Sequence, residues 1–212
     1  MSADPLPPSW RRWWNALAAP HAQALQRPAQ RAVVARWSEA GRHYHATQHL
    51  LECLAEFDQV AALAQRPAEV EAALWFHDAV YDPHRHDNEA RSAELWRTML
   101  APAGVADETL ERVAALVLAT RHGMATSVTA DAALVVDIDL AILAAPPARF
   151  AEYERQIRAE YAFVPIDVYR QKRRAVLQGF AERPRLYTTA YFHERCDASA
   201  RENLARAIAG LD

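Results

Sequence analysis

A first group of residues that could bind a metal or take part in catalysis lies in the segment HYHATQH, residues 43–49. His45 and His49 are four residues apart, and on a helix this spacing puts both imidazoles on one face. Two imidazoles on one face could share a metal or catalytic site. The alternative interpretation is that one histidine caps a helix while the other packs as an ordinary interfacial side chain.

The second group lies in the apolar segment ALWFHDAVYD, residues 73–82, where His77 and Asp78 are adjacent. Burying a carboxylate is costly unless a cation or hydrogen bonds compensate its charge. A metal ion would satisfy both side chains at once. A buried hydrogen bond between the aspartate and the histidine, without any metal, is the alternative.

Two further carboxylates, Asp137 and Asp139, lie in the apolar segment VVDIDLAIL, residues 135–143. Unpaired acids in such a segment would also be costly, so a cation is expected nearby. Residues two apart on a helix point about 200° away from each other, so only one of the two can face a given site. The other is expected to cap a helix or to meet solvent.

The three groups follow one another in the order His, His-Asp, Asp, which is a mixed set of nitrogen and oxygen ligands. Such a set suits a divalent Mn, Fe, Co, Ni or Mg ion, and it is not the thiolate set of a cysteine-rich zinc site. We therefore expect a divalent metal site with one or two ions.

Helices are the elements expected to position these residues. The chain has only five glycines and no Asn-Gly or Asp-Gly dipeptide, and apolar residues recur at helical spacing, which predicts an all-α fold. The helices are predicted at 8–19, 28–40, 46–65, 67–80, 87–101, 106–121, 130–145, 147–161, 165–181 and 196–210. The β-branched run at 134–143 would also suit a buried strand, but its alanine-rich flanks favour a helix.

The length of 212 residues fits one domain with short terminal additions. Basic and acidic residues nearly cancel, 24 against 27, so general nucleic-acid binding is not expected and a small-molecule substrate is favoured. Only two cysteines occur, and no apolar run has the length of a signal peptide or membrane span. We therefore expect a cytoplasmic protein without a membrane partner.

The segments RHYHATQHL, FHDAVYDP, DNEARSAEL, ATRH and DIDLAIL occur here in a characteristic order. In this order they resemble the HD superfamily of metal-dependent phosphohydrolases, and within it a poorly characterised bacterial group. The resemblance covers about residues 43–143 and implies a single-domain HD-type helical bundle. It implies the metal ligands His49, His77, Asp78 and Asp139; Asp139 is preferred because its following leucine is similar to the family's last motif, with Asp137 as the alternative.

The resemblance also implies roles for three other residues. His45 resembles the histidine that protonates the leaving group in the cyclic-nucleotide phosphodiesterase branch, although it could instead donate to a carboxylate and orient the ligand helix. Asp82 resembles a second acidic group near the attacking water, but Pro83 restricts its backbone to extended geometry. His122 resembles a histidine that serves a second metal or the substrate phosphate; a helix-ending role beside Gly123 is the alternative.

The function implied by the resemblance is hydrolysis of a phosphoester or phosphoanhydride of a small molecule, with a nucleotide expected by analogy, through metal-activated water. One alternative is a non-catalytic metal-binding or nucleotide-binding regulatory domain. A second is a di-iron HD oxygenase, which would need further histidines close to the His-Asp pair.

Overall fold

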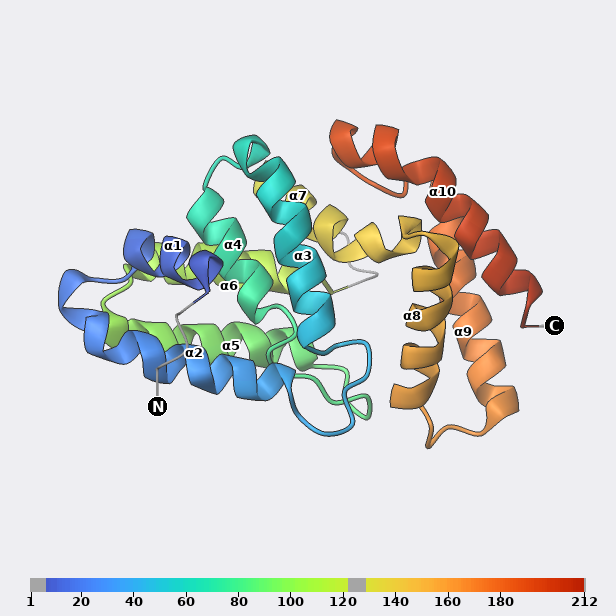
Figure 1. The fold of residues 1–212 in the computed structure, drawn as a ribbon, viewed down its shortest axis with the longest axis horizontal. Coiled ribbons are helices and arrows are strands. Elements are labelled where there is room, and N and C mark those ends of the chain that lie inside the picture. Colours follow the sequence, from blue (N-terminus) through green and yellow to red (C-terminus); the bar gives the residue numbers. More distant parts are fainter. Residues whose placement is uncertain (1–6, 122–128, 212) are drawn as a thin grey trace. The chain divides into compact units, whose positions relative to one another are not determined.

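The computed structural model describes residues 7–121 and 129–211 of the chain. Within these residues it contains ten α-helices and no β-strand, which confirms the predicted all-α fold (Figure 1). The helices are α1 (Pro8–Leu17), α2 (Gln23–Trp37), α3 (Thr47–Val60), α4 (Pro67–Phe76), α5 (Asn88–Leu100), α6 (Asp107–Ala119), α7 (Ala130–Asp139), α8 (Pro147–Glu160), α9 (Ile166–Ala181) and α10 (Ala190–Ala209). None of the helices in this described part combines the length and hydrophobicity of a membrane span.

The chain divides into two compact units, Met1–Val136 and Asp137–Asp212. The division falls inside α7, so most of this helix belongs to the first unit and its last turn belongs to the second. A short 3-10 helix, η4 (Leu140–Ala144), continues from the end of α7.

Helix α4 is the central element of the first unit and packs against α1, α3, α5 and α6 (Figure 1). Every residue from Glu69 to Phe76 is buried. A helix that is buried on all sides lies in an interior, because each of its faces must be covered by another element. The C-terminal end of α4, which precedes His77 and Asp78, is therefore enclosed by its neighbours.

Aromatic side chains fill the space around α4. Trp13 on α1 is fully buried, and its ring lies 6.2 Å from that of Phe76 on α4 and 5.8 Å from that of Trp96 on α5. Trp37, at the end of α2, donates its indole N–H to the carbonyl oxygen of Trp75 at 3.0 Å. This bond ties the end of α2 to the last turn of α4, next to the predicted metal ligands.

The second unit contains α8, α9 and α10, with α10 packed on α9 and on η4. The side-chain amide of Asn203, buried on α10, donates to the carbonyl oxygens of Leu143 and Ala145, both at 2.8 Å. These bonds satisfy two of the carbonyls left open where η4 ends.

Two helices begin earlier than the sequence predicts. α10 starts at Ala190 instead of residue 196, because Thr189 caps it by accepting a hydrogen bond from the amide of Phe192. α2 starts at Gln23 instead of residue 28, and Pro28 lies inside the helix.

Candidate metal centre

Helices α3 and α4 bring two of the predicted ligands together. His49 lies in the first turn of α3, and His77 follows directly after α4. Their Nε2 atoms are 3.1 Å apart, and the two residues are only 2% and 1% exposed. Two histidines far apart in sequence thus meet at a buried point.

A backbone contact determines which nitrogen of His77 is available. Its Nδ1 lies 2.9 Å from the carbonyl oxygen of Leu74, and because a carbonyl oxygen only accepts, Nδ1 carries the proton of this bond. In its neutral form His77 therefore presents the lone pair of Nε2 toward His49 and Asp78. A backbone bond of this kind is how proteins commonly orient a histidine that binds metal.

The carboxylate of Asp78 reaches the same point. Its Oδ2 lies 3.2 Å from Nε2 of His77 and 3.8 Å from Nε2 of His49. The sequence analysis predicts that the helix continues to residue 80, but α4 ends at Phe76. His77 keeps helical backbone angles as the C-cap of α4, and Asp78 follows in the turn after it.

Cys53 is a functional candidate that the sequence analysis missed. It lies one helical turn after His49 on α3, is 2% exposed, and its Sγ is 3.6 Å from Nδ1 and 3.8 Å from Nε2 of that histidine. The spacing of four residues between a predicted ligand and a cysteine was the signal available in the sequence.

The separations between these atoms suit a shared cation. Ligands bound at about 2.0–2.3 Å to one ion lie about 3–4 Å from each other. The distances among His49, His77 and Asp78 fall in this range, and the ligand atoms of His49, Cys53 and His77 all lie within 4.8 Å of one another. His49, Cys53 and His77 are buried and could hold a metal ion, with the partly exposed Asp78 beside the two histidines. No protein-family model, curated protein sequence or solved structure matches this chain.

Arg42 connects the two chain segments that carry the ligands. Its guanidinium donates to the carbonyl oxygens of His45 (3.2 Å), Asp78 (2.6 Å) and Ala79 (3.1 Å), and it is held by the carboxylate of Glu39 at 2.9 Å. The side chain of Arg42 is only 3% exposed. The planar fork of an arginine suits such a set of acceptors, so Arg42 fixes the turn after α4 against the segment before α3.

His45 lies in the turn before α3, which begins at Thr47, so it does not share a helical face with His49 as the sequence analysis expects. The two rings are nevertheless neighbours, with centroids 6.2 Å apart. His45 also stacks on Tyr81 with a centroid distance of 4.0 Å. The half-buried His45 is therefore held at the edge of the candidate metal centre by an aromatic ring.

Asp82 lies in the loop after α4, because that helix ends at Phe76. Its Oδ1 accepts a hydrogen bond from the amide of His84 at 2.9 Å, and its own amide donates to Asn88 at 3.1 Å. These bonds stabilise the loop. A role for Asp82 near an attacking water stays a prediction.

The last predicted ligand belongs to the second unit. Asp139 is the final residue of α7, and its assignment as a ligand stays a prediction. Asp137 is fully buried, and its carboxylate accepts bonds from the amides of Thr188 (2.9 Å) and Thr189 (2.7 Å) and from the Thr189 hydroxyl (2.7 Å). Burial raises the pKa of Asp137, and these bonds offset part of that rise. The predicted site residue His122 lies outside the described residues.

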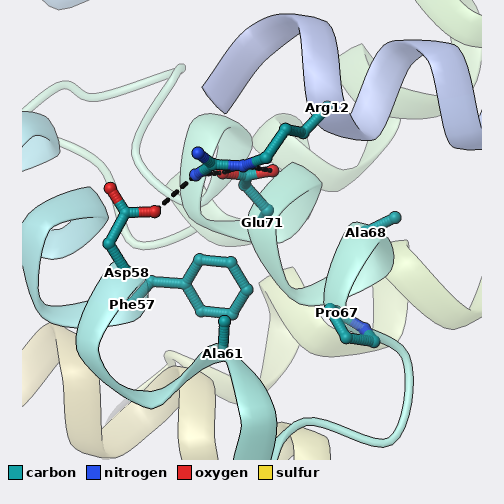
Figure 2. Close-up of a pocket in the computed structure, with 7 residues that line it drawn as sticks. All are labelled: Arg12, Phe57, Asp58, Ala61, Pro67, Ala68 and Glu71. Carbon is teal, nitrogen blue, oxygen red and sulfur yellow. Dashed lines mark hydrogen bonds and ion pairs between the residues drawn. The ribbon is translucent and has the colours of Figure 1, made fainter. Parts of the chain in front are cut away.

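A cavity of about 390 Å³ lies elsewhere in the first unit (Figure 2). Figure 2 shows Arg12 directed toward Asp58 and Glu71 above an apolar floor that includes Phe57. The guanidinium bonds to Asp58 at 2.5 Å and also pairs with Glu71. Two carboxylates therefore already balance this arginine, and the cavity is not suited to an anionic phosphate group.

Proposed function

We propose that this chain is a metal-dependent hydrolase that cleaves a phosphoester or phosphoanhydride bond of a small molecule, with nucleotides as the first substrate class to test. The observation that carries the proposal is the convergence of Nε2 of His49, Nε2 of His77 and Oδ2 of Asp78 at one buried point. The resemblance of the sequence to HD phosphohydrolases supports the same conclusion, and it adds Asp139 as the fourth proposed ligand.

The donor set fits a divalent cation, because two imidazole nitrogens and a carboxylate are ligands that Mn, Fe, Co, Ni and Zn ions accept. When bound, such an ion stabilises charge on a phosphoryl oxygen and lowers the pKa of water. His77 and Asp78 are oriented for binding by the Leu74 carbonyl and by the Arg42 bond to the backbone of Asp78.

His45 is the proposed proton donor to the leaving oxygen. It is half-buried beside His49, and its stacking on Tyr81 limits the orientations that its ring can adopt. A general acid must be held within reach of the group that it protonates, and a stacked ring loses little freedom when substrate binds. Tyr81 therefore acts in this proposal as a positioning residue for His45.

The test is phosphate release from a panel of nucleotides and generic phosphoesters. Metal-stripped protein is compared with the same protein after addition of Mn, Co, Ni, Zn or Mg. We expect turnover that needs added metal and that falls by at least about 100-fold in Asp78→Asn, because the variant loses a charged ligand.

Asp167→Asn is the matched control, because Asp167 is an exposed aspartate on α9 and the same substitution there should leave turnover unchanged. Turnover that survives Asp78→Asn would contradict the proposal. Binding of metal and nucleotide without turnover across the panel would replace it with a regulatory binding domain.

A further inference from the structure

Cys53 and His49 lie on one face of α3, and both point to the place where His77 arrives. Cys53 is 2% exposed, and its Sγ lies 3.6–3.8 Å from the two ring nitrogens of His49. The sulfur is also within 4.8 Å of the ligand atom offered by His77. The separation of Sγ from the His49 nitrogens is one that ligands of a common ion adopt, and His77 offers a second buried imidazole nearby.

We propose that Cys53 is a sulfur ligand of the metal centre, and that the centre therefore selects a thiophilic divalent cation, Zn, Co or Fe, over Mg. The proposal deepens the proposed function, since it concerns the same metal site. Sulfur ligands favour such ions, whereas Mg prefers oxygen ligands and near-octahedral geometry. The centre differs in this respect from the nitrogen and oxygen set that the sequence analysis expects.

Coordination by Cys53 replaces its S–H bond by a bond from sulfur to the metal, and the proton leaves to solvent. No oxidant or reductant takes part. A thiolate at the buried position of Cys53 would be costly by itself, and the bound cation compensates its charge.

The first test is Co2+ titration of metal-stripped full-length protein without substrate, followed by absorption spectroscopy. A thiolate bound to Co2+ produces an intense charge-transfer band in the near ultraviolet, whereas histidine and carboxylate ligands do not. In the wild-type protein we expect this band to grow until one equivalent of Co2+ has been added. If Co2+ binds without producing the band, or does not bind, the proposal is overturned, and this result needs no variant.

The chain offers a matched control because it contains only two cysteines, Cys53 and Cys196, and both are buried. Cys196 lies on α10 in the second unit. Cys196→Ser should keep the band, and Cys53→Ser should lose it. Loss of the band in Cys196→Ser with retention in Cys53→Ser would overturn the assignment.

Competition with a chromophoric chelator gives a second readout. Cys53→Ser should lower the affinity for Zn2+ by at least about tenfold and leave the affinity for Mg2+ unchanged, because only the thiophilic ion depends on sulfur. Cys53→Ala, which removes any oxygen that could replace the sulfur, should lower Zn2+ affinity at least as much. Equal Zn2+ affinity in the wild type and in both folded Cys53 variants would show that the sulfur only contacts His49.

The spectroscopic test and the activity test fail independently. A charge-transfer band without phosphate release would support the role of Cys53 and contradict the proposed hydrolase. Metal-dependent and Asp78-dependent phosphate release from a centre that shows no band would support the hydrolase and overturn the role of Cys53.

Discussion

His77 illustrates how a single contact prepares a residue for chemistry. An imidazole has two nitrogens of similar basicity, and the bond from Nδ1 to the Leu74 carbonyl leaves Nε2 facing His49 and Asp78. A proton donated by His49 or a cation between the two Nε2 atoms would satisfy this 3.1 Å contact. The arrangement of these residues is therefore compatible with a bound cation.

His45 carries a prediction about the separation of catalysis from metal binding. His45→Gln should lower kcat by about 10²–10⁴-fold, the usual contribution of a general acid. The affinity for Co2+ should stay unchanged, because His45 lies beside His49 and stacks on Tyr81 outside the proposed ligand set. Steady-state kinetics and Co2+ titration of the same preparation measure both quantities.

His193→Gln is the control for this substitution, since His193 lies 41% exposed on α10. It should change neither kcat nor Co2+ affinity. A parallel loss of both in His45→Gln would assign His45 to orientation of the ligand segment instead of proton transfer.

Arg42 joins the turn before α3 to the turn after α4, and its bond to Asp78 links residues that are 36 positions apart in the sequence. Arg42→Lys should lower metal affinity by about 10–100-fold, as is usual when a group that orients ligands is lost. A lysine ammonium cannot reproduce the planar fork that reaches the carbonyls of His45, Asp78 and Ala79. Isothermal titration with Zn2+ measures the change.

Arg97→Lys is the control, because Arg97 pairs with Glu111 at 2.7 Å and so joins α5 to α6 instead of the two segments that carry the ligands. Its metal affinity should equal that of the wild type. If Arg42→Lys also keeps wild-type affinity, Arg42 contributes to folding alone.

At the contact of α1 with α4, Arg12 compensates the charge of Glu71, which is only 2% exposed. Burial raises the pKa of Glu71, and Arg12 offsets part of this rise. For an acid with a raised folded-state pKa, the contribution to stability is fully present below its unfolded pKa and is lost as the pH rises through the folded pKa. Without Arg12 the pKa of Glu71 rises further, so more stability is lost as the pH rises.

Arg12→Ala should therefore reduce the free energy of unfolding by about 1–3 kcal/mol near neutral pH, and by less in acid, where Glu71 is protonated. Urea unfolding at several pH values measures the difference. Adding Glu71→Gln to the variant should remove most of the pH dependence. An equal loss at neutral and acid pH would mean that Arg12 acts through packing.

For the whole molecule, metal binding should be linked to folding. Because the proposed ligands come together only in the folded chain, an ion at about 100 times its Kd should add about 2.7 kcal/mol to the free energy of unfolding. Metal-stripped protein should therefore show a lower Tm, and added Zn2+ should increase the hydrogen-exchange protection of α3 and α4. The same rise in Asp78→Asn would contradict binding at this centre.

The boundary between the two units, after Val136, lies next to the two candidate aspartates. Asp139→Asn should reduce the rise in Tm produced by Zn2+ if Asp139 is the ligand that the sequence resemblance implies. Asp137→Asn should lower the Tm of the metal-stripped protein but keep the rise, because Asp137 is engaged by Thr188 and Thr189 at the start of α10. The opposite pattern would exchange the two assignments.

Most of the helices could be predicted from local rules. Helical spacing of apolar residues, the scarcity of glycine and the placement of proline are properties of neighbouring residues, and they sufficed to predict the all-α fold. His77 and Asp78 could also be singled out, since polar groups within apolar segments require compensation, whereas His49 was singled out by its spacing from His45 and by the resemblance.

Features that depend on distant parts of the chain could not be predicted in this way. The end of α4 at Phe76, the reach of Arg42 to Asp78 and the approach of Cys53 to the His49–His77 pair all arise from packing between α3, α4 and the turns beside them. Residue spacing gives the face of a helix, but only the packed helices bring two such faces to one buried point. The free energy of burying these groups depends on all of the neighbours together.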